Sequence, residues 1–169
     1  DMRKLAVSIS KGGVGKTTTA VNLAGGLALS GEKVLLIDVD TQAQSSYILE
    51  VKPEAGLAEV ITEEITIDEA MVQARDNLWI LAGGRNLAGV KRLISRKDYG
   101  GEMMLTQTLD PIDGQFDFVI LDTAPGWDSL TINVLFYARE ILAPVSLEVA
   151  SIQGLKGFLI SLSDIKQYN

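Results

Sequence analysis

Apolar residues are arranged along this chain in two ways. In the first, short runs hold apolar residues at consecutive positions, with little alternation with polar ones. A strand that is covered on both faces of a sheet shows such a run, because both of its faces carry apolar side chains. We therefore expect buried strands at residues 5–9, 33–38, 78–83, 116–122 and 140–147.

In the second arrangement, apolar residues recur every three or four positions, which is the period of an amphipathic helix. The clearest case begins at Lys16, where Ala20, Leu23, Ala24 and Leu27 fall on one side. The pattern predicts helices at residues 16–30 and 130–138, and a helix that begins at 86–94 and is interrupted by Gly100 and Gly101. It also predicts a last helix, whose apolar side carries Leu155, Phe158, Leu159, Leu162 and Ile165. Weaker helical signals lie at 57–61 and 67–74.

Strands and helices alternate along the chain, and this order is typical of an α/β fold. We expect a mainly parallel sheet flanked by helices. The sequence shows no internal repeat, low-complexity tract or linker, so a single domain over residues 1–169 is the economical interpretation.

Composition removes several classes of protein. The chain has no cysteine and no histidine, which excludes disulfides, thiolate-held clusters, a histidine-based catalytic triad and an ordinary zinc site. The absence of cysteine also fits a cytoplasmic protein. The net charge of −7 argues against a globally basic surface for nucleic acid, and the basic cluster of Lys91, Arg92, Arg96 and Lys97 is expected to be a solvated helix face.

The segment SKGGVGKTTT, residues 10–19, joins the first expected strand to the first expected helix. Glycines let backbone amides approach a ligand closely, and a helix N-terminus adds positive potential, so this arrangement favours phosphate binding. Lys16 would reach the β- and γ-phosphates, the Thr17 hydroxyl would bind Mg²⁺, and Thr18 could contact the α-phosphate. The alternative is a glycine-rich turn with incidental lysines.

Three carboxylates stand where expected strands end. Asp38 and Asp40 follow the second strand, and Asp122 follows four apolar residues in FVILDTAPG, a pattern similar to a Walker B motif. A carboxylate at that place holds Mg²⁺, usually through a water molecule. The alternative for each aspartate is a helix cap or turn residue.

The loop KGGVGKTT resembles the deviant Walker A motif of the ParA/MinD family of P-loop ATPases, in which a signature lysine comes early; here that lysine is Lys11. The resemblance implies a P-loop NTPase fold that uses ATP and Mg²⁺. It also implies a homodimer in which each Lys11 reaches the nucleotide held by the partner. The resemblance implies that Lys11, Lys16 and Asp40 are catalytic, with Asp40 positioning the attacking water. It implies that the metal is held by Thr17, Asp38 and Asp122. The implied nucleotide-binding residues are Lys11, Gly12, Gly13, Val14, Gly15, Lys16, Thr17 and Thr18.

The chain departs from the family pattern at a few positions. Ser10 replaces the first glycine of the general phosphate-loop pattern, Thr41 replaces a frequent proline, and Ala124, Gly126 and bulky Trp127 alter the turn after Asp122. Two further segments resemble family surfaces: LAGGRNLAGV, a connector near the dimer face, and ASIQGLKGF, the start of a helix at the dimer and partner surface. An ordinary turn and an ordinary helix start remain the alternatives.

The resemblance extends over nearly the whole chain and predicts a dimerisation switch, gated by ATP, that acts in plasmid or chromosome partitioning with non-specific DNA and a ParB-like partner protein that stimulates hydrolysis. The segments NLAG and SIQGLKG favour ParA/Soj-like members over MinD-like ones, and no membrane anchor is visible. Family members continue further, so we expect a C-terminal truncation, with adenine and DNA contacts beyond Asn169. The alternatives are a MinD-like or other cargo-positioning ATPase, a metabolic P-loop enzyme, and a regulator that has lost hydrolysis.

Overall fold

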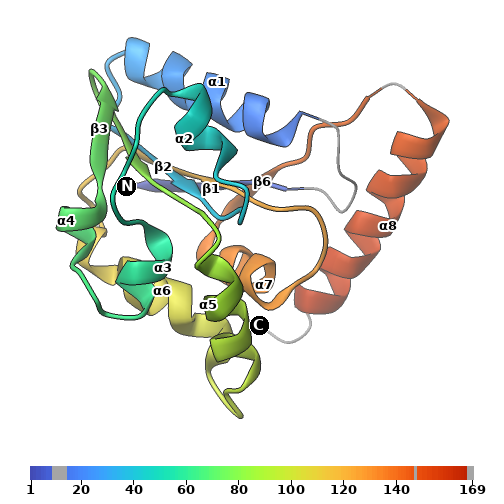
Figure 1. The fold of residues 1–169 in the computed structure, drawn as a ribbon. Helices are drawn as coiled ribbons and strands as arrows, with labels where there is room; N and C mark the ends of the chain where they lie inside the picture. The colour runs from blue at the N-terminus through green and yellow to red at the C-terminus, as the bar shows by residue number, and fades with distance from the viewer. Residues whose placement is uncertain (9–14, 147, 167–169) are drawn as a thin grey trace.

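The computed structural model describes residues 1–8, 15–146 and 148–166. Within these residues, six strands form one sheet in the order β3-β4-β2-β5-β1-β6 (Figure 1). Every neighbouring pair is parallel except β3 and β4, which are antiparallel. The strands are β1 (Arg3–Val7), β2 (Val34–Asp38), β3 (Val72–Arg75), β4 (Leu78–Leu81), β5 (Phe118–Asp122) and β6 (Glu140–Leu142).

Helices cover both faces of this sheet (Figure 1). Helices α1 and α2 lie over one face, α3, α5, α6 and α7 lie over the other, and α8 stands to one side. The α-helices are α1 (Lys16–Leu29), α2 (Gln44–Ile48), α3 (Leu57–Ile61), α4 (Ile67–Ala70), α5 (Leu87–Ser95), α6 (Met104–Leu109), α7 (Ser129–Tyr137) and α8 (Val149–Lys166), with short 3-10 turns η1 (Gly101–Met103) and η2 (Asp110–Ile112). No described helix is long and apolar enough to cross a membrane.

The central strand β2 shows why its apolar run does not alternate. Leu35 and Ile37 belong to the hydrophobic cluster under α3, α5, α6 and α7, whereas Val34 and Leu36 belong to the cluster under α1. All four side chains are fully buried. The predicted α/β fold with a mainly parallel sheet flanked by helices is therefore confirmed, and the sheet brings the carboxyl ends of β1, β5 and β2 side by side.

The predicted helix at 67–74 is wrong beyond Ala70. Thr66 and Glu69 cap the start of α4, but the chain then turns into β3, an edge strand paired with β4. Val72 and Ala74 pack against the apolar cluster while Gln73 and Arg75 are exposed. This two-residue period is that of a half-buried strand, and over so few residues it resembles a weak helical signal.

Several other bounds differ from the prediction, most clearly at the ends of β6 and β4. The last strand, β6, ends at Leu142 instead of reaching residue 147, because its partner β1 ends at Val7 and Pro144 follows without an N–H to donate. Strand β4 ends at Leu81, where the chain enters a glycine turn. Helix α2 lies in a stretch for which the apolar pattern predicts no element.

Candidate functional site

The sheet register brings two of the predicted carboxylates together. Asp38 and Asp122 are the last residues of β2 and β5, and they face each other as parallel register partners. Asp122 is also the partner of Val7, the last residue of β1, after which the glycine loop begins. Both carboxylates are buried, with exposed fractions of 0% for Asp38 and 1% for Asp122.

The Asp38 carboxylate holds the loop that follows β2. Its Oδ1 accepts a hydrogen bond from the backbone N–H of Asp40 (2.9 Å), and its Oδ2 accepts one from the backbone N–H of Ser45 (3.2 Å). Burial raises the pKa of Asp38 to about 7, although these hydrogen bonds act in the opposite direction and the charge of Asp122 adds to the rise. Asp38 therefore fixes the course of residues 39–45.

The two oxygens of the Asp122 carboxylate differ in their hydrogen bonding. Its Oδ2 accepts a hydrogen bond from the Ser45 hydroxyl (3.0 Å), whereas its buried Oδ1 has no hydrogen-bond partner among the described residues. Burial raises the pKa of Asp122, and the hydroxyls of Thr17 and Ser45 oppose that rise. A buried oxygen of this kind is costly unless something else binds it.

Lys16 brings a positive charge to the same place. It is the first residue of α1 and is only 7% exposed. Burial lowers the pKa of Lys16, and the charges of Asp122 and Asp40 counteract this effect, which places both carboxylates near the ammonium group. The preceding Gly15 has φ +75°, a left-handed conformation that favours glycine.

Asp40 is the least buried of the three carboxylates. Its Oδ1 accepts a hydrogen bond from the backbone N–H of Gln42 (3.0 Å), and its backbone oxygen accepts one from Gly84 (3.0 Å). The side chain is partly exposed, and its negative charge acts to raise the pKa of Lys16. A carboxylate in this position can orient a water molecule that approaches a ligand bound at Lys16.

The structure thus brings together Lys16, Thr17, Asp38, Asp40 and Asp122, while Gly15 leads into the same helix and Thr18 is exposed in its first turn. The predicted residues Lys11, Gly12, Gly13 and Val14 lie outside the described residues. Ser45 was not singled out from the sequence, although it contacts both buried carboxylates. Its only signal was its place among small polar residues after Asp40.

The donor set fits a hard divalent cation. Mg²⁺ prefers oxygen ligands and keeps several water molecules. The unpartnered Oδ1 of Asp122 and the neighbouring Thr17 hydroxyl supply such oxygens. In the described part of the chain, no cluster of three acidic residues could enclose a metal by itself. A cation here would need further oxygens from water or from a bound ligand.

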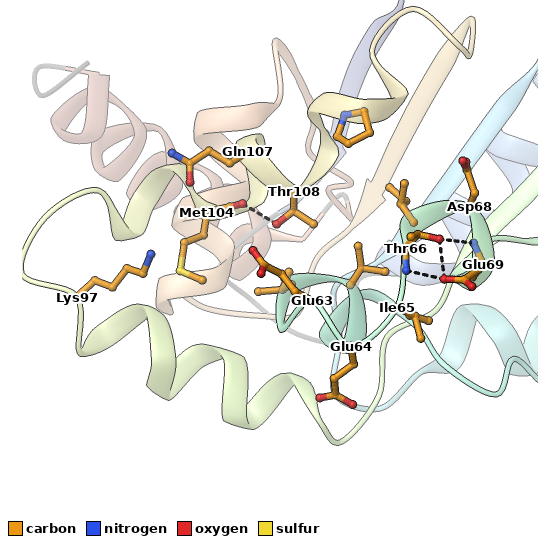
Figure 2. Close-up of a pocket in the computed structure, with 14 residues that line it drawn as sticks. Glu63, Glu64, Ile65, Thr66, Asp68, Glu69, Lys97, Met104, Gln107 and Thr108 are labelled. Carbon is orange, nitrogen blue, oxygen red and sulfur yellow. Dashed lines mark hydrogen bonds between the residues drawn. The ribbon is translucent and has the colours of Figure 1, made fainter.

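A separate pocket of about 690 Å³ lies between α3, α4 and α6 (Figure 2). None of the predicted site residues lines it. The dashed lines in Figure 2 mark two sets of hydrogen bonds. Those between Thr66 and Glu69 cap the start of α4, and the Thr108 hydroxyl donates to the Met104 backbone oxygen within α6. The pocket is therefore distinct from the carboxylate site.

Comparisons with known proteins agree with this fold. A family model described as an AAA domain matches residues 2–169. The chromosome-partitioning ATPase Soj of Thermus thermophilus is 34% identical over 98% of this chain and 63% of its own length. A cobyrinic acid a,c-diamide synthase from Mycobacterium smegmatis, solved with ADP and magnesium, superposes with a TM-score of 0.90 at 32% identity, over 99% of this chain and 69% of the synthase. McdA of Cyanothece gives a TM-score of 0.91 at 26% identity, over 100% of this chain and 68% of McdA.

These matches place the chain among P-loop nucleotide-binding proteins. Within that class, it belongs to the ParA/Soj-like family. The chain spans 63% of the length of the Thermus relative and 59% of that of the Myxococcus xanthus ParA.

Proposed function

We propose that this chain is the nucleotide-binding part of a ParA-type ATPase, an ATP-gated dimerisation switch that partitions plasmid or chromosomal DNA in the cytoplasm. The observation that carries this proposal is the meeting of Lys16, Asp40 and Asp122 at the carboxyl ends of parallel strands. ATP is the expected nucleotide because the similar synthase was solved with ADP and magnesium, and a variant of McdA with ATP.

The residues take the roles that phosphoryl transfer requires. Lys16 neutralises charge on the β- and γ-phosphates, and the backbone of residues 12–18 binds the phosphates. Asp40 orients a water molecule, which attacks the γ-phosphorus; the bond to the bridging oxygen of ADP breaks, and phosphate leaves. Thr17 and Asp122 would hold Mg²⁺, which neutralises phosphate charge when bound, and Asp38 supports this site by fixing the loop.

Lys11 is the reason why we propose a dimer. In the family that the loop resembles, this lysine acts on the nucleotide of the partner subunit. A cation supplied in trans stabilises the transferring phosphoryl group only when two subunits meet, so hydrolysis is coupled to association. The full-length protein would then bind non-specific DNA as the ATP dimer, and a ParB-like partner would stimulate hydrolysis and reset it.

We infer that the C-terminal end of α5 adds a DNA contact to those expected beyond Asn169. No acidic residue occurs from Leu78 to Lys97; Arg92 is exposed on α5 and Arg96 is exposed directly after its last residue. Reversing both charges should weaken retention of random duplex DNA by the ATP-bound protein, because phosphate contacts dominate non-specific affinity. Reversal of Lys52 and Arg139, two exposed cations elsewhere, is the matched control. Equal loss in both variants would exclude α5 as the DNA surface.

The decisive experiment is light scattering on Asp40→Ala in the full-length protein, with ATP, with ADP, and with ATP plus duplex DNA. Loss of water positioning should trap an ATP dimer that retains DNA, while ADP leaves a monomer. A monomer in every condition would refute the dimerisation switch. A dimer that ignores DNA would favour a MinD-like or other cargo-positioning ATPase.

A second candidate is a metabolic P-loop enzyme, which the similarity to the diamide synthase favours. In such an enzyme, ATP would activate a carboxylate of a small substrate. ATP consumption by the purified protein that depends on an added carboxylic acid and an amide-nitrogen donor, and not on DNA or dimerisation, would support that candidate over the partition switch.

A further inference from the structure

The turn after β4 packs directly on the loop that carries Asp40. A Cβ atom at Gly83 would overlap the backbone oxygen of Asp40, and it would lie 2.9 Å from the backbone oxygen of Asp38 and 3.0 Å from its Oδ1. These atoms belong to backbone or to a buried, hydrogen-bonded carboxylate, so they cannot move aside cheaply. A side chain at position 83 must therefore displace the Asp38–Asp40 loop.

The next residue binds the same loop. The backbone N–H of Gly84 donates a hydrogen bond to the backbone oxygen of Asp40 (3.0 Å), and Gly84 has φ +139°, a conformation that other residues rarely adopt. The backbone N–H of Asp40 donates to Oδ1 of Asp38 (2.9 Å), the same oxygen that a Cβ at Gly83 would approach. The main chain of Asp40 is thus bonded at its N–H by the Asp38 carboxylate and at its oxygen by the glycine turn.

The start of α3 contacts the glycine turn at Ala82 and so restricts movement of the turn away from the Asp40 loop. The backbone N–H of Leu57 donates to the backbone oxygen of Ala82 (2.8 Å), and a Cβ at Gly56 would overlap that oxygen. Glu59 ties the two segments together: its carboxylate accepts hydrogen bonds from the backbone N–H of Gly56 (2.8 Å) and from the Asn86 side chain (2.6 Å).

We infer that Gly83 and Gly84 are positioning residues for Asp40: they set the height of the Asp40 loop above the carboxyl ends of the strands. This inference rests on the proposed role of Asp40 in orienting the attacking water. The segment LAGG thereby has a mechanical role inside one subunit, in addition to any surface that it presents.

The first test is Gly83→Ala, studied by ATP binding and by single-turnover hydrolysis. Displacement of Asp40 should lower the hydrolysis rate by about 10- to 100-fold, the loss typical of a small misplacement of a reacting group. The dissociation constant for ATP should stay within about 3-fold of wild type, since Lys16 and the phosphate loop are untouched. Gly25→Ala is the matched control, because a Cβ there meets nothing within 4 Å.

The second test is a double-substitution cycle with Asp40→Ala. If Gly83 acts through Asp40, Gly83→Ala should cause no further loss of rate once Asp40 is gone, which is a strong departure from additivity. Multiplication of the two losses would overturn the inference. So would an equal loss of ATP binding and hydrolysis in Gly83→Ala, because that result indicates general damage.

Gly84→Ala keeps the inference testable if Gly83→Ala does not fold, as judged by circular dichroism and thermal melting. Its Cβ meets nothing within 4 Å, so the substitution strains the turn without a direct clash. The same non-additivity with Asp40→Ala is expected. Failure of the role proposed for Asp40 is distinguishable: Asp40→Ala would then hydrolyse ATP like wild type. Failure of this inference alone leaves Asp40→Ala inactive, while the glycine variants hydrolyse ATP like wild type, lose binding and hydrolysis equally, or show losses that multiply with that of Asp40→Ala.

Discussion

The hydroxyl of Ser45 lies 3.0 Å from Oδ2 of Asp122, although the two residues are 77 positions apart. Ser45 belongs to α2, which follows the Asp40 loop, and Asp122 ends β5. The backbone N–H of Ser45 also binds Asp38. One small residue therefore joins both buried carboxylates to the segment that follows Asp40.

Ser45→Ala should lower the free energy of unfolding by about 1–3 kcal/mol, because the substitution leaves a buried carboxylate oxygen without its donor. Urea denaturation of the nucleotide-free protein measures this change. Ser95→Ala is the control, since that hydroxyl bonds the Lys91 backbone at an exposed position. Equal stability of the two variants would mean that the Ser45 hydroxyl contributes nothing to holding Asp122.

Lys16→Ala should weaken ATP binding by about 10- to 100-fold, the equivalent of a charge-assisted hydrogen bond of about 1.5–3 kcal/mol. Calorimetric titration with a slowly hydrolysed ATP analogue measures this effect. Lys52→Ala removes an exposed lysine outside the site and should bind like wild type. Unchanged affinity in Lys16→Ala would refute the assignment of the phosphate loop.

The stability of the metal-free protein should carry a pH dependence that originates at Asp38. Burial raises the pKa of this carboxyl from its ordinary value of 3.8 to about 7 in the folded state. Between these values the folded protein binds more protons than the unfolded chain, so the free energy of unfolding falls as the pH rises from about 4 through about 7.

Asp38→Asn should remove this pH dependence of the free energy of unfolding, which is at most about 1.4 kcal/mol per pH unit. The substitution also lowers stability at every pH, because the new amide NH₂ faces a backbone N–H donor. Denaturation at several pH values in the presence of a chelator compares the two proteins. Asp98→Asn, at an exposed position, should retain the wild-type slope. Parallel pH profiles for wild type and Asp38→Asn would contradict the prediction.

Phe158 anchors α8. It is 2% exposed and stacks on Trp127, with ring centroids 5.2 Å apart, whereas Leu159 beside it is 55% exposed. Phe158→Ala should cost about 3–5 kcal/mol and Leu159→Ala far less, because only the first leaves a cavity. Thermal melting followed by tryptophan fluorescence reports both variants; a similar small cost for the two would show that α8 is not held through the ring stack.

The strand ends and the carboxylates on them could be predicted because apolar runs and motif spacing are local properties. The parallel sheet then forces Asp38 and Asp122 together. The role of Ser45 could not be predicted in this way, because its contacts are made across the fold. The edge strand β3 was missed since Val72 and Ala74 give only two apolar positions, too few to separate a period of two from a helical period.

The close contact of Gly83 with the Asp40 loop could not be predicted from the sequence either. Two glycines after a strand indicate a turn, but the sequence does not tell which backbone the turn will contact. That information appears only when β4 is placed beside β2 in the sheet, which brings Gly83 against the Asp40 loop.

The main chain of Asp40 carries the contacts that anchor its loop: its N–H binds Asp38, and its oxygen accepts from Gly84 and Ala43. The side chain contributes one hydrogen bond, to the backbone of Gln42. Replacement of the Asp40 side chain therefore leaves intact the main-chain contacts that shape its loop. The loop's architecture and the chemistry proposed for its carboxylate are separable: a single substitution at position 40 removes the second and keeps the first.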